Sequence, residues 1–352
     1  MGRATYRNKI TSDELIEKIN PKNKKLVDRF IKNFNTKRSD SSVNIYRSNF
    51  NIFFCWNLTY NFNKPFYDIR KSEFMDFFDF AVDEMKWSPN RYANMWSSLN
   101  TLSVFIENIL DDEYPDFKNN IKKIEKLPKT TVREKTILTD AQIQSLLSHL
   151  IEFDEYQQAF FVALAAYSGA RVSELFRFNT KNLNIMNVVY DGLFIETTEE
   201  IKTKGKGKQG KLIYKYILKA PFERYYNLWI IEREKIMLKN RKKHSHLFID
   251  KDGSELNKDS IRGWIREWEK YLTNDRKTNP ELEQVNLYAH AFRHYLCTYL
   301  AKIGLEQELI VELYGWASSE MFKIYNDMTA KDREWKSLEK LKTAVENNDM
   351  EK

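Results

Sequence analysis

The spacing of apolar residues changes twice along this 352-residue chain, and no other feature limits its fold as strongly. From Ser12 to about Leu127, apolar residues recur at intervals of three and four, the period of an amphipathic helix. We therefore expect residues 1–127 to form a compact, all-helical domain. Its many aromatic residues are interpreted as core, with stacking on single-stranded bases as the alternative. Four prolines should divide it into about five helices: Pro21, Pro65, Pro89 and Pro115.

A basic stretch without periodicity follows, from Lys122 to Leu138, and it contains Pro128. Such a stretch is typical of a linker, and we assign residues 128–138 to it and residues 139–352 to a second domain. Thr139 is the expected N-cap of the first helix of that domain, because its hydroxyl can accept a backbone N–H.

After Asn182 the apolar period shifts towards two, which predicts a small antiparallel sheet. The sequence TKGKGKQG, from Thr203 to Gly210, has the composition of a hairpin tip. Helical periodicity returns from Phe222 onward. The predicted fold class is therefore mainly α with a small antiparallel β-sheet, arranged as a helical domain followed by an α+β domain.

Composition narrows the environment and the partners. Lys and Arg number 57 against 50 Asp and Glu, and the pI is about 9.0, so the surface should attract polyanions. Nucleic acid, a membrane surface and a plain Lys-rich protein all fit this charge. Cys55 and Cys297 lie in apolar stretches, which favours a reducing compartment over a disulfide framework. No apolar run approaches the roughly 20 residues of a membrane span, so we expect a cytoplasmic location without membrane partners.

Three separated segments carry groups suited to breaking a phosphodiester without a metal. Arginine binds phosphate oxygens through its planar fork, and Arg171 follows Gly169 and Ala170 at an expected helix start. His290 and Arg293 are three residues apart, so both should lie on one helix face. Tyr325, on a short predicted helix, offers a phenol that can attack phosphorus.

These residues also have ordinary structural interpretations. Arg171 can form a surface ion pair with Glu174, His290 can be a core histidine, and Tyr325 is one of 19 tyrosines. A metal site on His290, His294 and Cys297 is geometrically possible, with His244 and His246 elsewhere. A two-metal nuclease would need clustered acids. The acidic cluster present is more typical of a solvated loop: Asp111, Asp112, Glu113 and Asp116.

Taken in order, the segments GARVSEL, GKGKQGK, HAFRH, YGWAS and KIY resemble the tyrosine recombinase family, the phage-integrase and Xer-like branch of the DNA breaking-rejoining enzymes. The resemblance implies a helical core-binding domain and an α+β catalytic domain. It also implies a role for the hairpin lysine Lys206 as proton donor, with Lys204 and Lys208 as rivals. The implied catalytic set is Arg171, Lys206, His290, Arg293, Trp316 and Tyr325.

The sequence departs from the family pattern in three places. The usual Leu-Gly-His before the tyrosine is Leu313-Tyr314-Gly315-Trp316 here, and the usual Leu-Arg-His is Phe292-Arg293-His294. The segment from Arg171 to Lys206 is also longer than in compact members. These departures leave a competent side chain at every catalytic position.

What the resemblance implies is a site-specific DNA recombinase of the integrase type. It would cut and rejoin duplex DNA through a covalent 3′-phosphotyrosine, without cofactor, metal or ATP. The implied partners are double-stranded DNA and an accessory excision factor. The implied assembly is a homo-tetramer on DNA and a monomer or weak oligomer when the protein is free. A segment after Tyr325 would dock on a neighbouring protomer through its apolar stripe, with packing on its own domain as the alternative: Trp335, Leu338, Leu341 and Val345. A DNA-binding regulator that kept this fold but lost strand exchange is the alternative function.

Overall fold

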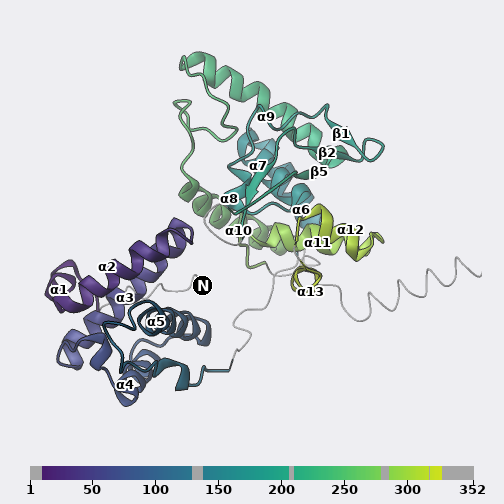
Figure 1. The fold of residues 1–352 in the computed structure, drawn as a ribbon. Coiled ribbons are helices and arrows are strands. Elements are labelled where there is room, and N and C mark those ends of the chain that lie inside the picture. Colours follow the sequence, from purple (N-terminus) through teal and green to yellow (C-terminus); the bar gives the residue numbers. More distant parts are fainter. Residues whose placement is uncertain (1–9, 129–137, 206–209, 279–284, 317, 327–352) are drawn as a thin grey trace, which may run out of the picture. The chain divides into compact units, whose positions relative to one another are not determined.

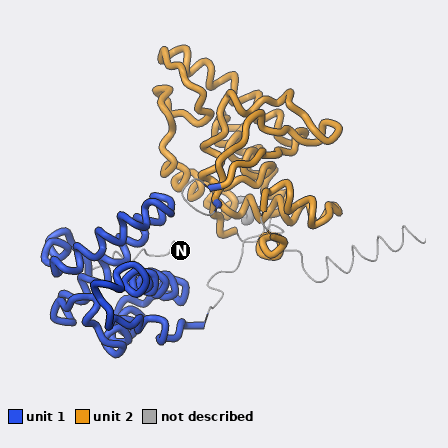
Figure 2. The backbone as a smooth tube through the Cα atoms, viewed as in Figure 1, with its two compact units in different colours: residues 1–134, 205–210 blue, residues 135–204, 211–352 orange. Residues whose placement is uncertain are grey.

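The computed structural model describes residues 10–128, 138–205, 210–278, 285–316 and 318–326. The chain divides into two compact units, which Figure 2 colours separately. Unit 1 consists of residues 1–134 with 205–210, and unit 2 consists of residues 135–204 with 211–352. The functional division into a core-binding domain, a linker and a catalytic domain stays a prediction. No helix among the described residues is both long and apolar enough to cross a membrane.

The described part of unit 1 is built from helices joined by short turns (Figure 1). Pro21 and Pro89 stand at the first position of their helices, where a missing N–H costs no hydrogen bond. The side chains of Asn20 and Ser88 cap these helices by accepting backbone N–H groups of Lys22 and Arg91. The elements are α1 (Asp13–Lys18), α2 (Pro21–Asn35), α3 (Asp40–Tyr60), η1 (Phe66–Asp68), α4 (Lys71–Asp83), α5 (Pro89–Ile109) and η2 (Ile121–Lys123).

Aromatic rings fill the core of unit 1, as the sequence predicted. Phe53 is fully buried and packs edge-to-face on Phe77, with ring centroids 5.0 Å apart. Such pairs add about 1 kcal/mol to the free energy gained by burial. The chain after α5 also belongs to this core, because the indole of Trp96 donates to the carbonyl of Ile124. The other rings with at most 2% exposure are Phe30, Phe50, Phe54, Phe66 and Phe78.

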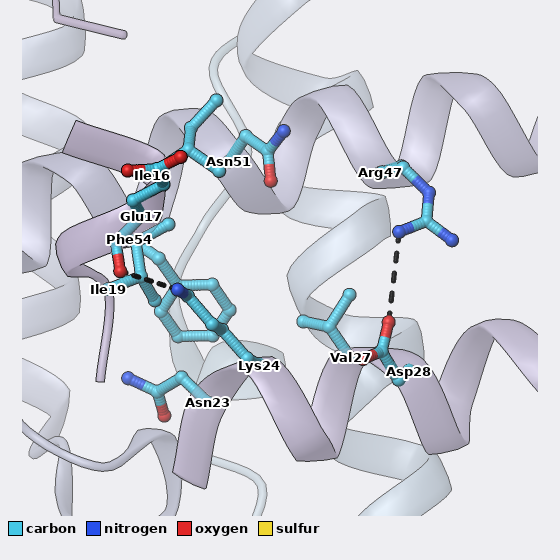
Figure 3. Close-up of a pocket in the computed structure, with 10 residues that line it drawn as sticks. All are labelled: Ile16, Glu17, Ile19, Asn23, Lys24, Val27, Asp28, Arg47, Asn51 and Phe54. Atoms are coloured by element: carbon cyan, nitrogen blue, oxygen red, sulfur yellow. Dashed lines mark hydrogen bonds and ion pairs between the residues drawn. The ribbon is translucent and has the colours of Figure 1, made fainter. Parts of the chain in front are cut away.

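A cleft of about 280 Å³ lies among α1, α2 and α3 (Figure 3). Three of its charged side chains, those of Lys24, Asp28 and Arg47, have partners from these helices. Lys24 donates to the carbonyl of Glu17 at 2.5 Å, and Arg47 lies 3.8 Å from Asp28. These contacts assign those three charges to helix packing.

Unit 2 surrounds the buried helix α7 (Tyr156–Ser168), which packs against α6, α9, α11 and the strand β5. Every residue of α7 from Ala159 to Ser168 is buried. The other helices are α6 (Asp140–Glu152), α8 (Val172–Leu175), α9 (Lys219–Lys239), η3 (Lys258–Ser260), α10 (Ile261–Thr278), α11 (Ala291–Lys302), α12 (Gln307–Leu313) and α13 (Glu320–Tyr325).

The strands of unit 2 form two small antiparallel sheets, which confirms the predicted fold class. One sheet has the order β1-β2-β5, and β2 pairs with β5 through Ile195 opposite Ile217. The other sheet is the hairpin β3-β4, in which Thr203 lies opposite Lys211. The strands are β1 (Val188–Val189), β2 (Phe194–Glu196), β3 (Ile201–Thr203), β4 (Lys211–Ile213) and β5 (Tyr216–Leu218).

Candidate active site

Arg171 stands at the turn between α7 and α8, and a glycine makes that turn. Gly169 ends α7 in the left-handed conformation, with φ of +58°. A side chain at this position would also collide with Tyr314, because an added Cβ would lie 2.6 Å from its ring. Glycine therefore serves both the backbone and the close approach of another segment.

Glu174 anchors the guanidinium of Arg171. The Nη1 of Arg171 donates to Glu174 Oε1 at 2.7 Å and to the hydroxyl of Thr203 at 3.1 Å. The Thr203 hydroxyl in turn donates to the same carboxylate oxygen. Among the described residues, the guanidinium donates only through Nη1. The ion pair that gave Arg171 an ordinary structural interpretation thus exists, and it leaves Nε and Nη2 available.

Burial works to raise the pKa of Glu174, since this residue is fully buried. The ammonium of Lys215, the Thr203 hydroxyl and the charge of Arg171 outweigh that effect and lower the pKa to about 2. The carboxylate is therefore ionised at neutral pH. The cations near this single carboxylate are Lys215, Arg171 and Arg293. The site therefore has excess positive charge, which suits a phosphate.

Arg293 lies in the interior on α11, with 1% of its surface exposed. Its Nη1 donates to the carbonyl of Gly169 at 2.5 Å, which ties α11 to the turn that carries Arg171. Its Nε and Nη2 are buried without a partner among the described residues. Leaving such donors unpaired costs about 1–3 kcal/mol each, so folding alone does not explain them.

Aromatic rings surround the guanidinium of Arg293. Its carbon lies 4.5 Å from the ring centre of Tyr314, 5.2 Å from Trp316 and 5.1 Å from Tyr325. The rings of Trp316 and Tyr325 are stacked, with centroids 5.3 Å apart and planes 16° apart. Cation–π attraction holds a guanidinium in such a setting.

Tyr325 is the last residue of α13 and is half-buried. The buried ring of His294 lies 4.8 Å from it, and Thr298 donates to its carbonyl at 3.4 Å. The indole Nε1 of Trp316 is another buried donor without a partner among the described residues. The phenol thus lies beside two sources of unpaired N–H groups.

His290 occupies the N-cap position of α11, one residue before the helix begins, without a capping hydrogen bond from its side chain, and its surface is exposed. Partial loss of hydration around the ring and the positive charges of Arg171 and Arg293 lower its pKa. The imidazole is therefore neutral at pH 7. The structure brings His290 close enough to both arginines for their charges to act on it.

Of the three hairpin lysines, Lys204 is described and is exposed. Lys206 and Lys208 lie outside the described residues. Lys211, at the start of β4, donates to the carbonyl of Gly315 at 3.4 Å, so the far strand of this hairpin contacts the residue before Trp316. Among the described residues, no group of three side chains is arranged to hold a metal ion.

The position of Gly169 before Arg171 was part of the sequence prediction. Sequence reasoning missed three other residues that hold the predicted groups in place, namely Thr203, Lys215 and Tyr314. Lys215 had a detectable signal. Ile213, Lys215 and Ile217 are spaced by two residues, so in an extended chain all three face the same side. A lysine between two isoleucines on one side is a candidate for a buried charge, and Lys215 is buried. The contact between Gly169 and Tyr314 had no such signal, because it joins distant segments.

Comparison with known proteins places the chain in a family. The phage integrase family model matches residues 136–332. The recombinase-like protein YomM of the SPbeta prophage of Bacillus subtilis is 25% identical over 295 residues, covering 83% of this chain and 82% of that protein. A tyrosine recombinase of Thermosipho africanus is 24% identical over 211 residues, covering 59% of this chain and 62% of the relative.

The fold has a counterpart among solved structures. The integrase of transposon Tn1549, in complex with transposon right end DNA, superimposes with a TM-score of 0.63. The match covers 90% of this chain and 98% of that one, at 18% identity.

The family model covers more than half of the chain, and the chain therefore belongs to the phage integrase family. Its function is accordingly that of a site-specific DNA recombinase of the tyrosine type. Neither the fold nor these relatives favours the alternative of a regulator without strand exchange.

Proposed function

We propose that Tyr325 cuts one strand of duplex DNA by attacking a backbone phosphorus, and that this recombination chemistry is performed by the six residues predicted from sequence. The observation that carries the proposal is the set of buried, unpartnered donors beside the phenol, contributed by Arg293 and Trp316. Donors that are fixed before the reaction are the groups that stabilise charge developing on a phosphate.

In this proposal, Arg171 and Arg293 grip the non-bridging oxygens of the phosphate, and Trp316 donates one further hydrogen bond. Arg171 is supported in this role by its anchored Nη1, since a guanidinium fixed at one nitrogen presents the others in a defined direction. Arg293 is supported by its contact with the carbonyl of Gly169, which fixes it beside the turn that carries Arg171.

The bond changes balance without an external reactant. The oxygen of Tyr325 forms a bond to phosphorus, and the bond from phosphorus to the 5′ oxygen breaks. Lys206 gives a proton to the departing 5′ oxygen, and the neutral imidazole of His290 takes the proton of the phenol. The 3′-phosphotyrosine conserves the energy of the broken bond, so a 5′ hydroxyl can reverse the step without ATP.

The partner of the reaction is double-stranded DNA, in keeping with the DNA complex of the Tn1549 integrase and the basic composition of this chain. Two exchanges between paired sites require four active subunits, and we propose a homo-tetramer on DNA. An accessory excision factor would set the direction of the reaction. The stripe from Trp335 to Val345, outside the described residues, would join neighbouring subunits.

A trapping experiment tests the proposed chemistry. Host DNA is sheared, nicked and incubated with the protein, and fragments linked covalently to protein are recovered and sequenced. We expect a covalent 3′ complex at a discrete site, and none with Tyr325→Phe at equal DNA binding. A wild-type protein that shifts duplex DNA in a gel but traps no strand would be a regulator.

A truncation tests the proposed assembly separately. Deleting the chain after Asp332 should leave binding to a single site unchanged but abolish paired complexes in a gel-shift assay. Normal recombination by the truncated protein would contradict a docking role for the segment.

A further inference from the structure

We infer that Lys215 is a positioning residue for DNA cleavage, which acts through Glu174 to hold Arg171 in the orientation that receives the phosphate. The inference rests on the proposed function and extends it to a residue that is not part of the predicted catalytic set. Lys215 lies between β4 and β5, at the base of the hairpin whose tip carries Lys206.

Lys215 is a buried cation with one ionic partner among the described residues. Only 2% of its surface is exposed, and its Nζ lies 2.8 Å from Glu174 Oε2. Its backbone is fixed as well, because its N–H donates to the hydroxyl of Thr197 and its carbonyl accepts from the Thr197 N–H. A lysine held in this way cannot reach solvent or a phosphate without breaking the local structure.

The two oxygens of Glu174 are thereby given different partners. Oε2 takes the ammonium of Lys215 and the backbone N–H of Arg171, while Oε1 takes Nη1 of Arg171 and the Thr203 hydroxyl. Because Lys215 occupies Oε2, the carboxylate cannot form the two-pronged pair that arginine and a carboxylate usually prefer. The guanidinium of Arg171 is anchored by one nitrogen and keeps its fork for another anion.

Removing the ammonium would change this arrangement in two ways. Glu174 would be left buried with Arg171 as its ion-pair partner, and rotation of the carboxylate would draw the guanidinium into a two-pronged pair and away from the phosphate. The charged groups that face Glu174 are Arg171 on the α7–α8 turn, Lys215 beside β5, Arg293 on α11 and the titratable His290 at its N-cap. Without Lys215, less positive charge would favour the ionised carboxylate, so its pKa would rise.

The test compares Lys215→Met with the matched variant Lys235→Met, which removes a lysine from an exposed ion pair with Glu232. The substrate is the duplex site recovered with the wild-type protein, and wild-type cleavage is measured first. If the wild-type protein did not cleave this site, the proposed function would be rejected rather than this inference. For Lys215→Met we expect a single-turnover cleavage rate at pH 7 about 10²-fold lower, because small misplacements of a reacting group have effects of that size. DNA affinity should stay within about threefold, and Lys235→Met should match wild type.

The pH profile separates positioning from a merely structural role. In Lys215→Met, cleavage should fall further as the pH is lowered through an ionisation that is absent from wild type, because protonated Glu174 no longer holds Arg171 even in the displaced pair. Lys215→Arg, which keeps the positive charge, should recover part of the rate and lose the added pH dependence. A Lys215→Met protein that cleaves like wild type at every pH would overturn the inference.

The double variant Glu174→Gln with Lys215→Met covers the case in which Lys215→Met fails to fold. Removing both charges of a buried pair is often tolerated, whereas removing one is strongly destabilising. We expect the double variant to regain the wild-type melting temperature and DNA affinity but to cleave slowly, since the amide that replaces the carboxylate would be a neutral anchor. A wild-type cleavage rate in the double variant would show that the pair serves folding alone.

Discussion

The two units differ in whether their buried polar groups have hydrogen-bond partners. In unit 1, the buried amide of Asn23 donates to the carbonyl of Lys64 and accepts the N–H of Phe66, and Asn49 is bonded to Ser98. Among the described residues, all buried side-chain nitrogens and oxygens without a partner belong to unit 2.

Three of those unpartnered atoms lie together at the candidate active site, on Arg293 and Trp316. Unit 1 shows that the chain can satisfy buried polar groups when only folding is at stake. The fourth unpartnered atom in the described part of the chain is Nδ1 of His244, outside the candidate site. The contrast teaches that unit 2 gives up folding free energy mainly at the candidate site, where an anion would supply the missing partners.

The contrast is tested most strongly by comparing two buried arginines of unit 2. Arg233 donates to the carbonyls of His244 and His246 and to Glu234, whereas Arg293 leaves two nitrogens unpaired. We expect Arg293→Met to lower single-turnover cleavage about 10³-fold, the effect of losing a donor to the transition state. Its melting temperature should stay close to that of wild type.

Arg233→Met should do the reverse, with a lower melting temperature and a normal cleavage rate per folded molecule. If Arg293→Met instead unfolded the protein while Arg233→Met did not, the unpaired donors would have to be assigned a structural role.

A second prediction concerns the close contact that holds the site together. Gly169→Ala combines a left-handed backbone with a collision against Tyr314, and we expect it to lower the free energy of unfolding by about 2–4 kcal/mol. Gly192→Ala is the matched control, because its φ is +83° but nothing lies within 4 Å of the added Cβ. Chemical denaturation of both variants measures the difference. Equal losses would mean that Tyr314 yields without cost.

A third prediction takes the comparison into unit 1. Asn23→Ala leaves the buried N–H of Phe66 unpaired and should cost about 2 kcal/mol of unfolding free energy. Asn44→Ala, at an exposed position of α3, should change stability by less than about 0.5 kcal/mol. Cleavage by the folded protein should be normal in both, and a specific loss of cleavage in Asn23→Ala would place unit 1 in the chemistry.

The smallest expected effect is that of Trp316→Phe. The substitution keeps a ring to stack on Tyr325 but removes the unpaired indole N–H, so cleavage should fall about tenfold, the value of one neutral hydrogen bond. Trp316→His, which restores a ring N–H donor, should recover part of that loss in the same single-turnover assay. An unchanged rate in Trp316→Phe would restrict Trp316 to packing.

Local patterns predicted the elements of the fold well. The helical region with its prolines, the shift of period after Asn182 and the return of helices at the C-terminal side all correspond to observed elements. The prolines were interpreted as interruptions, and Pro21 and Pro89 do stand at helix starts. The helix expected to contain both His290 and Arg293 begins one residue after His290, a boundary that capping geometry decides.

The candidate site was predictable only in part. Arg171, Arg293, Trp316 and Tyr325 belong to short motifs, so their presence could be read from sequence, and the structure brings the last three into contact. Apart from the pair between Arg171 and Glu174, the contacts that hold these residues in place could not be predicted, because they join segments that are distant in the sequence. The carbonyl of Gly169 accepts from a side chain on α11, and the carboxylate of Glu174 accepts from the lysine that precedes β5. Single-sequence periodicity has no information about such pairs.

The helix that ends in Tyr325 has six residues, and a segment so short has little helical stability of its own. Its conformation is therefore set by packing on α11 and α12 rather than by its own hydrogen bonds. The chain continues from Asn326, the residue after Tyr325. A force applied to that continuation would therefore displace Tyr325 before it displaced Arg171 or Arg293. The oxygen proposed to attack DNA is thus carried by a helix whose position depends on its neighbours.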